Sequence, residues 1–192
     1  MEKHKAKVSK KRQVNTYAEM WHASYVMLHK AKKDQEGSFY QLMASLIFTA
    51  FTLEAYLNHI GQRIFGCWDD LEQLSPLKKL NVIAEKLGVE KDDGKRPFQT
   101  ASELFQFRND VAHGKSVSLQ SDDQIRVMAD KFDEYMRKPL ETRWEAYCTL
   151  ENAERAREDI ESIIRKLHDA SGITDDMLFN SGMWFGSATL LP

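Results

Sequence analysis

The sequence predicts an all-α fold, a bundle of five or six helices. Apolar residues recur mostly at every third or fourth position, and no run that alternates apolar and polar residues extends beyond a few positions. Only 4 prolines and 9 glycines interrupt the 192 residues, which favours long segments of regular structure. At this length we expect one domain with a core of its own.

Six segments of the chain show the helical spacing of apolar residues. In the second segment the apolar positions spread beyond one stripe, which indicates a central helix buried on several sides. The third segment begins at Ser75-Pro76, a capping residue followed by proline at the first helical position, and it ends before Gly88. The expected helices cover about residues 14–33, 38–65, 76–87, 97–113, 121–138 and 140–170.

The two termini differ from the helical region in composition. Residues 1–12 hold six Lys or Arg against one Glu, a formal balance of +5, in a chain whose net charge is −2. We expect residues 1–13 to be a disordered basic tail. Residues 14–172 would then form the helical domain. Residues 173–192 include the apolar, glycine-punctuated run MLFNSGMWFGSATLLP, and we expect them to pack on the body or on a partner subunit.

The composition argues against several classes of protein. A net charge of −2 gives no overall attraction to nucleic acid, and no apolar run approaches the roughly 18 residues of a membrane span. The N-terminus lacks the apolar region of a secretory signal. Cys67 and Cys148 stand far apart and form neither a metal-binding nor a disulfide pattern. We expect a cytoplasmic protein with no membrane partner and no metal site.

The stretch FRNDVAHGK, residues 107–115, places an arginine, an asparagine, an aspartate and a histidine within six residues. Asn109 and His113 are four apart and share a helix face. Arg108 and His113 are five apart, so about 140° separates them on an ideal helix. They converge only if the helix end distorts at Gly114 or if two copies of the helix face each other across a two-fold axis. An ordinary helix end, with His113 near the negative pole of the dipole, fits the same residues.

Part of this stretch, RNDVAHG, resembles the Rx4–6H signature of the HEPN superfamily. Arg108 is followed by four residues and then His113, with the polar Asn109 directly after the arginine. The order of the expected elements also agrees with the family: two long helices, a shorter connection, the motif helix and a long charged helix. The resemblance covers roughly residues 15–170 and implies a HEPN-like helical bundle that pairs into a dimer.

An upstream stretch adds to the resemblance. AFTLEAYLNHI, residues 50–60, is similar to the family's earlier helix, which often carries a glutamate and a polar or basic residue four positions later. Glu54 and Asn58 occupy these positions, and Asn58 departs from the Lys or Arg often found there. A carboxylate in so apolar a helix needs a partner, so we expect Glu54 to pair with Arg108 or to face a solvent seam.

The resemblance implies metal-independent cleavage of RNA, as in many members of the family, and no cofactor. Attack by the ribose 2′-OH needs a base, an acid and a cation that stabilises the charged phosphorane. Histidine, which titrates at about pH 6.5, serves as base or acid, and arginine offers a fixed fork to phosphate oxygens. Two motifs across a dimer supply both histidines. The expected catalytic residues are Arg108, His113 and Asn109, with Glu54 and Asn58 supporting them and Lys115 contacting RNA.

The partners implied by the resemblance are RNA and a second copy of the chain. Such proteins often act as toxins or antiviral defence effectors, held in check by an antitoxin or a defence-system partner protein. The alternative is a non-catalytic HEPN-like module that binds RNA or a nucleotide, or scaffolds an assembly. An unrelated helical protein with a chance match stays open as well. Burial of Arg108 against Glu54, with no open cleft beside it, would favour the non-catalytic alternative.

Overall fold

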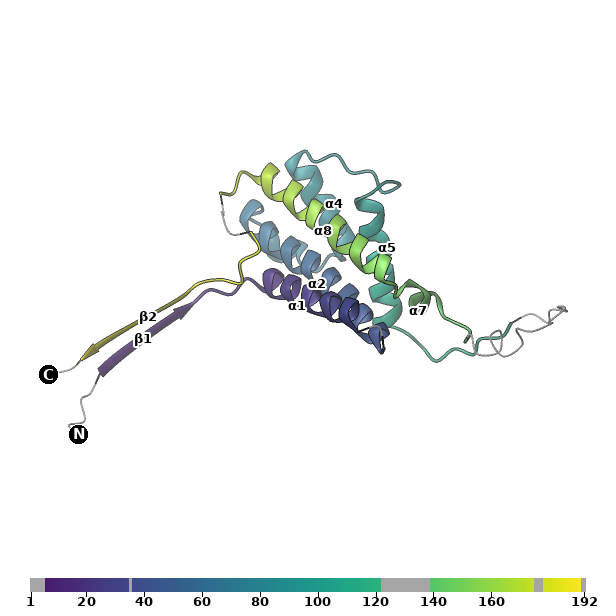
Figure 1. The fold of residues 1–192 in the computed structure, drawn as a ribbon. Helices are drawn as coiled ribbons and strands as arrows, with labels where there is room; N and C mark the ends of the chain where they lie inside the picture. Colours follow the sequence, from purple (N-terminus) through teal and green to yellow (C-terminus); the bar gives the residue numbers. More distant parts are fainter. Residues whose placement is uncertain (1–5, 35, 122–138, 175–177, 191–192) are drawn as a thin grey trace, which may run out of the picture.

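The computed structural model describes residues 6–34, 36–121, 139–174 and 178–190, and over these ranges the chain is mainly helical (Figure 1). The predicted all-α fold is confirmed as far as the chain is mainly helical, and it is corrected by one two-stranded sheet. The described elements, in chain order, are β1 (Ala6–Arg12), α1 (Thr16–Lys33), α2 (Ser38–Ile64), α3 (Trp68–Leu71), α4 (Pro76–Leu87), α5 (Phe98–Ala112), α7 (Arg143–Tyr147), α8 (Leu150–Ser171) and β2 (Trp184–Leu190).

The helices α1 and α2 form a hairpin, and α2 runs through the centre of the bundle (Figure 1). Gly37 at the turn has a φ of 74°, a left-handed conformation that glycine adopts without strain. Three hydroxyl groups are buried between the two helices. The Ser24 hydroxyl lies 2.6 Å from that of Thr49 and 3.2 Å from that of Ser45, so these polar groups are satisfied inside the core. The fully buried side chains of α2 include Leu46, Ala50, Leu53 and Leu57.

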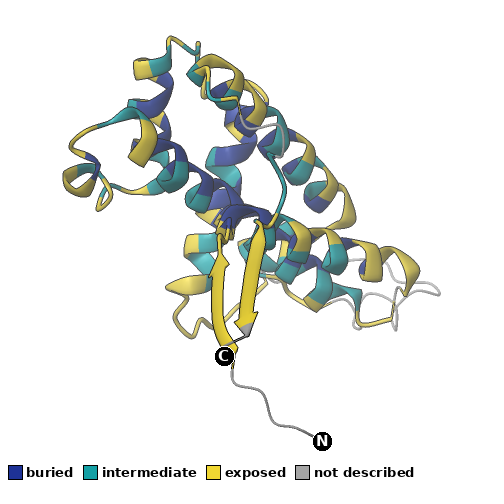
Figure 2. Ribbon diagram, turned by 90° about the vertical axis from the view of Figure 1, so that its left-hand side faces the viewer, coloured by how far each residue is buried: buried dark blue, intermediate teal, exposed yellow. Residues whose placement is uncertain are grey.

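The helices α4, α5 and α8 complete the core around α2, and Figure 2 shows their buried residues on the faces that meet. An ionic contact fixes the start of α5. The carboxylate of Asp159, on α8, accepts hydrogen bonds from Arg96 Nε at 2.7 Å, Arg96 Nη2 at 2.9 Å and the Thr100 hydroxyl at 2.6 Å. The contact ties the start of α5 to α8. Buried residues of α8 include Ile160, Ile163, Ile164 and Leu167.

The prediction of one helix over residues 140–170 is wrong, because the segment forms two helices. Tyr147 ends α7 and Leu150 begins α8. Thr149 caps α8: its side chain accepts a hydrogen bond from the Asn152 backbone N–H at 3.1 Å. The Asn152 amide in turn donates to the Tyr147 carbonyl at 3.0 Å. These bonds satisfy groups that a broken helix leaves open. The helix expected over 121–138 lies, apart from Ser121, outside the described residues.

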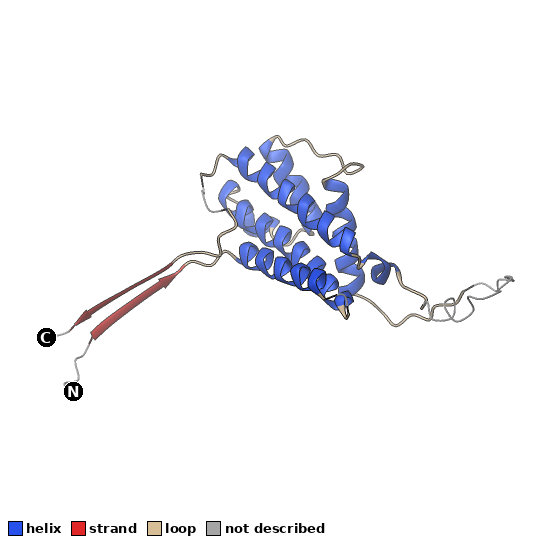
Figure 3. Cartoon of the chain, viewed as in Figure 1, coloured by secondary structure: helices blue, strands red, loops and turns tan. Residues whose placement is uncertain are grey.

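The termini differ most from expectation, since residues 6–12, expected to be disordered, form β1 and pair antiparallel with β2 (Figure 3). Of the segment 173–192, the described residues pack on the body only in part. Leu178 and Phe179 contact the core, whereas residues 184–189 are exposed. The described side chains of both strands are exposed, so neither strand is half-buried, and the lysines among small residues in 6–12 give no strand pattern in the sequence.

Candidate functional site

The motif arginine leaves α5 on the side that faces α2. Its Nη2 contacts the Glu54 carboxylate on α2, and its Nη1 donates to the side-chain oxygen of Asn109 at 2.9 Å. The expected pairing of Glu54 with Arg108 is therefore present. The side chain of Arg108 is 18% exposed and that of Glu54 is 28% exposed, so the contact is half-buried and reachable from solvent.

The guanidinium of Arg108 is held on several sides, yet some of its hydrogen-bonding capacity is unused. Its central carbon lies 5.7 Å from the centre of the Phe105 ring. Its Nε is buried and has no hydrogen-bond partner among the described residues. An arginine carries five N–H donors, and two of its nitrogens are engaged here. The position of the charge is fixed, and one N–H on each of Nη1 and Nη2 remains for a further acceptor, whereas the Nε is enclosed.

His113 lies at the opposite edge of the motif and is exposed. It follows Ala112, the last residue of α5, and its backbone N–H donates to the Asn109 carbonyl at 2.9 Å. Gly114 does not adopt the positive φ that we considered for a distorted helix end. It stands there for a different reason, since a Cβ at this position would lie 2.9 Å from the Asp110 carbonyl oxygen. Lys115, the expected RNA contact, follows as an exposed residue.

A single copy of α5 therefore does not direct both motif side chains to one point. The helix stays regular through Ala112, and regular geometry leaves Arg108 and His113 about 140° apart. Arg108 points toward α2, where Glu54 holds it. His113 sits at the exposed end of the helix. The distorted helix end considered from the sequence is therefore not formed.

Asn58 lies one turn beyond Glu54, and a residue missed by the sequence analysis holds it. Lys79, on α4, is 4% exposed and donates from its Nζ to the Asn58 side-chain oxygen at 2.8 Å. A cation thus stands beside the position where the resembled family often has Lys or Arg. The helical spacing does carry a signal for this residue, since Lys79 is four residues before the buried Ile83.

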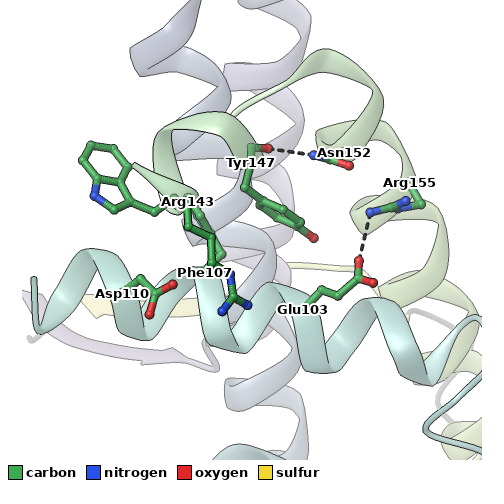
Figure 4. A pocket seen from close by; sticks show the side chains of 8 residues that line it. Glu103, Phe107, Asp110, Arg143, Tyr147, Asn152 and Arg155 are labelled. Atoms are coloured by element: carbon green, nitrogen blue, oxygen red, sulfur yellow. Dashed lines mark hydrogen bonds and ion pairs between the residues drawn. The ribbon is translucent and has the colours of Figure 1, made fainter. Parts of the chain in front are cut away.

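A pocket of about 290 Å³ opens on another face of α5 (Figure 4). Two arginines and two carboxylates line it, so its formal charges balance. Arg155 donates to Glu103 at 2.9 Å across it. Neither Arg108 nor His113 is among its lining residues, which are Glu103, Phe107, Asp110, Arg143, Trp144, Tyr147, Asn152 and Arg155. The pocket therefore lies on a different face of α5 from Arg108 and His113, although Phe107 and Asp110 of the same stretch line it.

Comparisons with family models, curated proteins and solved structures give no match for this chain. Over the described ranges, His, Cys, Asp and Glu side chains form no group of three or more placed to hold a metal ion. None of the helices described is both long and apolar enough to cross a bilayer.

Proposed function

We propose that this chain is a HEPN-like, metal-independent endoribonuclease that works as a homodimer with a composite Arg/His site. The contact among Glu54, Arg108 and Asn109 carries the proposal, because it fixes a partly exposed guanidinium whose Nη1 and Nη2 each keep a further N–H donor. Such an arrangement is suited to an anionic transition state. In the cytoplasm the protein would act as a toxin or an antiviral defence effector, controlled by an antitoxin or a defence-system partner.

The pairing of two copies is part of the proposal because one copy leaves Arg108 and His113 apart. The face of α2 that carries Glu54 offers a surface for it. Phe51, one turn before Glu54, is 39% exposed, and Tyr40, further along the same side of the helix, is 69% exposed. Large apolar side chains that stand exposed beside a candidate site favour a protein contact there. A second copy on this face would cover them and bring its own motif close.

The proposed reaction is an internal transesterification. One His113 accepts the proton of the ribose 2′-OH while the 2′ oxygen attacks the adjacent phosphorus. The partner subunit's His113 donates a proton to the 5′ oxygen as the P–O5′ bond breaks. Arg108 stabilises the additional negative charge on the phosphorane, and Asn109 holds the guanidinium or donates to a phosphate oxygen. The products are a 2′,3′-cyclic phosphate and a 5′-hydroxyl.

One observation favours a second candidate function, a non-catalytic module that binds RNA or a nucleotide or scaffolds an assembly. Arg108 is 18% exposed, contacts Glu54, and lies outside the lining of the pocket. An arginine in this state also serves to tie α5 to α2. In that case the same residues hold the fold, and RNA is bound without being cut.

The test is a panel of RNAs incubated, without added metal, with wild type, His113→Ala and His22→Ala. His22 is exposed on α1 and serves as the matched control. We expect His113→Ala to cleave about 10²–10⁴-fold more slowly and His22→Ala to cleave normally. Analysis of the product ends should find the cyclic phosphate. Undiminished cleavage by His113→Ala refutes the mechanism. RNA binding by a wild type that never cleaves supports the second candidate.

The shared site has its own test in sedimentation at micromolar protein concentration. We expect a dimer for wild type, and a shift toward monomer for Phe51→Glu, which places a charge on the exposed face of α2. Loss of cleavage together with loss of the dimer supports a composite site. A wild type that is monomeric while it cleaves RNA contradicts it.

A further inference from the structure

The two terminal strands form a ribbon that projects from the helical bundle (Figure 1). The ribbon consists of β1 and β2, whose seven residue pairs run from Ala6 opposite Leu190 to Arg12 opposite Trp184. It leaves the bundle at the end where α1 begins, whereas the chain leaves α5 at the other end (Figure 1). The ribbon is therefore a separate surface from Arg108 and His113.

The ribbon carries positive charge only. Lys7, Lys10, Lys11 and Arg12 lie on β1, and neither strand contains an acidic residue. All seven residues of β1 are exposed. Arg12 has a weak contact with Glu19 at 3.8 Å, and both of these side chains are exposed to solvent. Four cations on fourteen residues make the ribbon strongly basic in a chain whose net charge is −2.

Each face of the ribbon combines an aromatic ring with a cation. Residues directly opposite each other in an antiparallel pair project to the same face. Trp184 lies opposite Arg12, and Phe185 lies opposite Lys11, so the two pairs occupy opposite faces. Trp184 is 65% exposed and Phe185 is 58% exposed. The six-membered ring of the indole lies close to Gly186, where a Cβ would be 3.0 Å from its Cη2 atom.

The base of the ribbon is fixed to the bundle, so the rings and charges have a defined place. Gln13 N–H donates to the Met183 carbonyl at 2.9 Å, which extends the ladder beyond the two strands. Gly182 has a φ of 118°, and a Cβ there would lie 2.0 Å from the Gln13 carbonyl oxygen, so glycine is required. Below it, the ring of Phe179 stacks on Trp21 with ring centres 5.1 Å apart.

From this geometry we infer that the ribbon binds single-stranded nucleic acid. Cations that follow a phosphate backbone, together with exposed rings on which bases stack, are the features of sites that bind single strands without sequence preference. Lysines on an edge strand also prevent edge-to-edge association, but that role does not explain two exposed aromatic rings beside them. A two-stranded ribbon with no core of its own is marginal in water, and a stacked strand would bury its exposed rings.

The inference does not depend on the proposed cleavage, and the experiment keeps the two apart. Binding of a fluorescein-labelled, unstructured 20-nucleotide RNA is measured by anisotropy in the full-length His113→Ala protein, which leaves the RNA intact. The matching DNA strand and an RNA duplex are measured beside it. The added variants are Trp184→Ala, Phe185→Ala and the pair Lys10→Gln with Lys11→Gln. Matched controls are Tyr25→Ala and the pair Lys78→Gln with Lys86→Gln, all exposed elsewhere.

The aromatic variants and the lysine pair should weaken binding in different ways. Each aromatic variant should raise the Kd about 5- to 100-fold with little change in salt dependence. The lysine pair should make the slope of log K against log salt less steep by about 1.4, since each phosphate contact on a single strand adds about 0.7. The controls should bind as the parent protein does. Single strands of RNA and DNA should bind alike, and more tightly than the duplex.

Three outcomes overturn the inference: no binding of the single strands by the parent protein, binding that the ribbon variants leave unchanged, or a preference for the duplex. Far-UV circular dichroism and sedimentation of each variant complete the test. A change of oligomeric state in the ribbon variants, with binding unaffected, would assign the ribbon to a contact between copies of the chain. Loss of cleavage in His113→Ala with normal RNA binding would leave the inference intact.

Discussion

The two ends of α5 each hold an arginine against a carboxylate, and they differ in how fully the contact is satisfied. Near the N-terminal end, the Asp159 side chain is 8% exposed and accepts three hydrogen bonds from Arg96 and Thr100. Near the C-terminal end, Arg108 and Glu54 are 18% and 28% exposed. There the Arg108 Nε has no hydrogen-bond partner within the described residues.

The contact of Arg96 with Asp159 stabilises the fold, whereas the contact of Arg108 with Glu54 positions a charge that can still bind a ligand. Asp159 is enclosed by its donors, so a ligand could add little to it. Arg108 is placed by Glu54 and Asn109 while part of its fork stays free. The same pair of residue types therefore serves stability at one end of the helix and, in our proposal, RNA cleavage at the other. Variants at the two ends should have opposite consequences.

The largest expected effect is on the rate of RNA cleavage, at the C-terminal end of α5. Arg108→Ala should lower the cleavage rate about 10²–10³-fold, because it removes the donor that stabilises the phosphorane. Its cost in stability should stay near 1 kcal/mol, since Glu54 can turn to water when its partner is lost. Metal-free RNA cleavage and urea unfolding of the same preparation measure the two effects.

Arg108→Lys sharpens this result. It keeps the charge and loses the planar fork, so its rate should fall between wild type and Arg108→Ala. If Arg108→Ala unfolds at much lower urea concentration and still cleaves RNA, the contact at the C-terminal end of α5 stabilises the fold and does not serve cleavage. Arg108 would then be the structural arginine, as the non-catalytic alternative requires.

The second largest effect is on stability, at the N-terminal end of α5, where Asp159 is enclosed by its donors. Asp159→Ala should destabilise the protein by about 2–3 kcal/mol, because Thr100 loses its acceptor and the Arg96 guanidinium loses its carboxylate. The Tm should fall by about 4–12 °C for a chain of this size. Cleavage measured well below the Tm should be normal. Thermal unfolding by circular dichroism gives the stability.

Glu158→Gln is the matched control for Asp159→Ala. Glu158 also accepts from Arg96, at 3.0 Å, but its side chain is 76% exposed. The neighbouring exposed contact should contribute little, so the Tm should hardly change. Equal losses from both substitutions would mean that burial does not distinguish the two carboxylates.

The bundle follows from local signals in the sequence, and the ribbon does not. The ends of α1, α2, α4 and α5 lie within two residues of those expected, because apolar spacing and Gly or Pro breakers act over a few positions. Pairing of residues 6–12 with 184–190 joins the two ends of the chain, and no short window of sequence records it. The helical spacing of apolar residues continues across residues 140–170, yet the capping residue Thr149 separates α7 from α8.

The same distinction holds at the candidate site. The contact between Glu54 and Arg108 could be expected because a carboxylate in an apolar helix needs a cation. The contact between Lys79 and Asn58 could not, since an amide makes no such demand. Neither the pocket nor the aromatic–cation pairs of the ribbon could be found from sequence, because both depend on which elements meet.

The smallest expected effect is between the two ends of α5, where α7 covers the helix. The Tyr147 ring lies 5.2 Å, centre to centre, from that of Phe107. Its buried hydroxyl makes no hydrogen bond of good geometry within the described residues, although Arg155 lies close enough to act on its pKa. Tyr147→Phe keeps the ring contact and removes the unsatisfied group. It should leave the free energy of unfolding unchanged or raise it by up to about 1 kcal/mol at pH 7.

The stability difference between Tyr147→Phe and wild type should increase with pH. Burial raises the pKa of Tyr147 above its ordinary value of 10.0. The unfolded chain therefore loses this proton first as the pH rises past 10, and wild type loses stability until the folded protein also ionises. The phenylalanine variant lacks this loss, so its advantage in urea unfolding should grow between pH 7 and pH 10.5. If Tyr147→Phe is clearly less stable than wild type at pH 7, the hydroxyl has a stabilising partner. The middle of α5 would then resemble its N-terminal end, where the polar groups are satisfied.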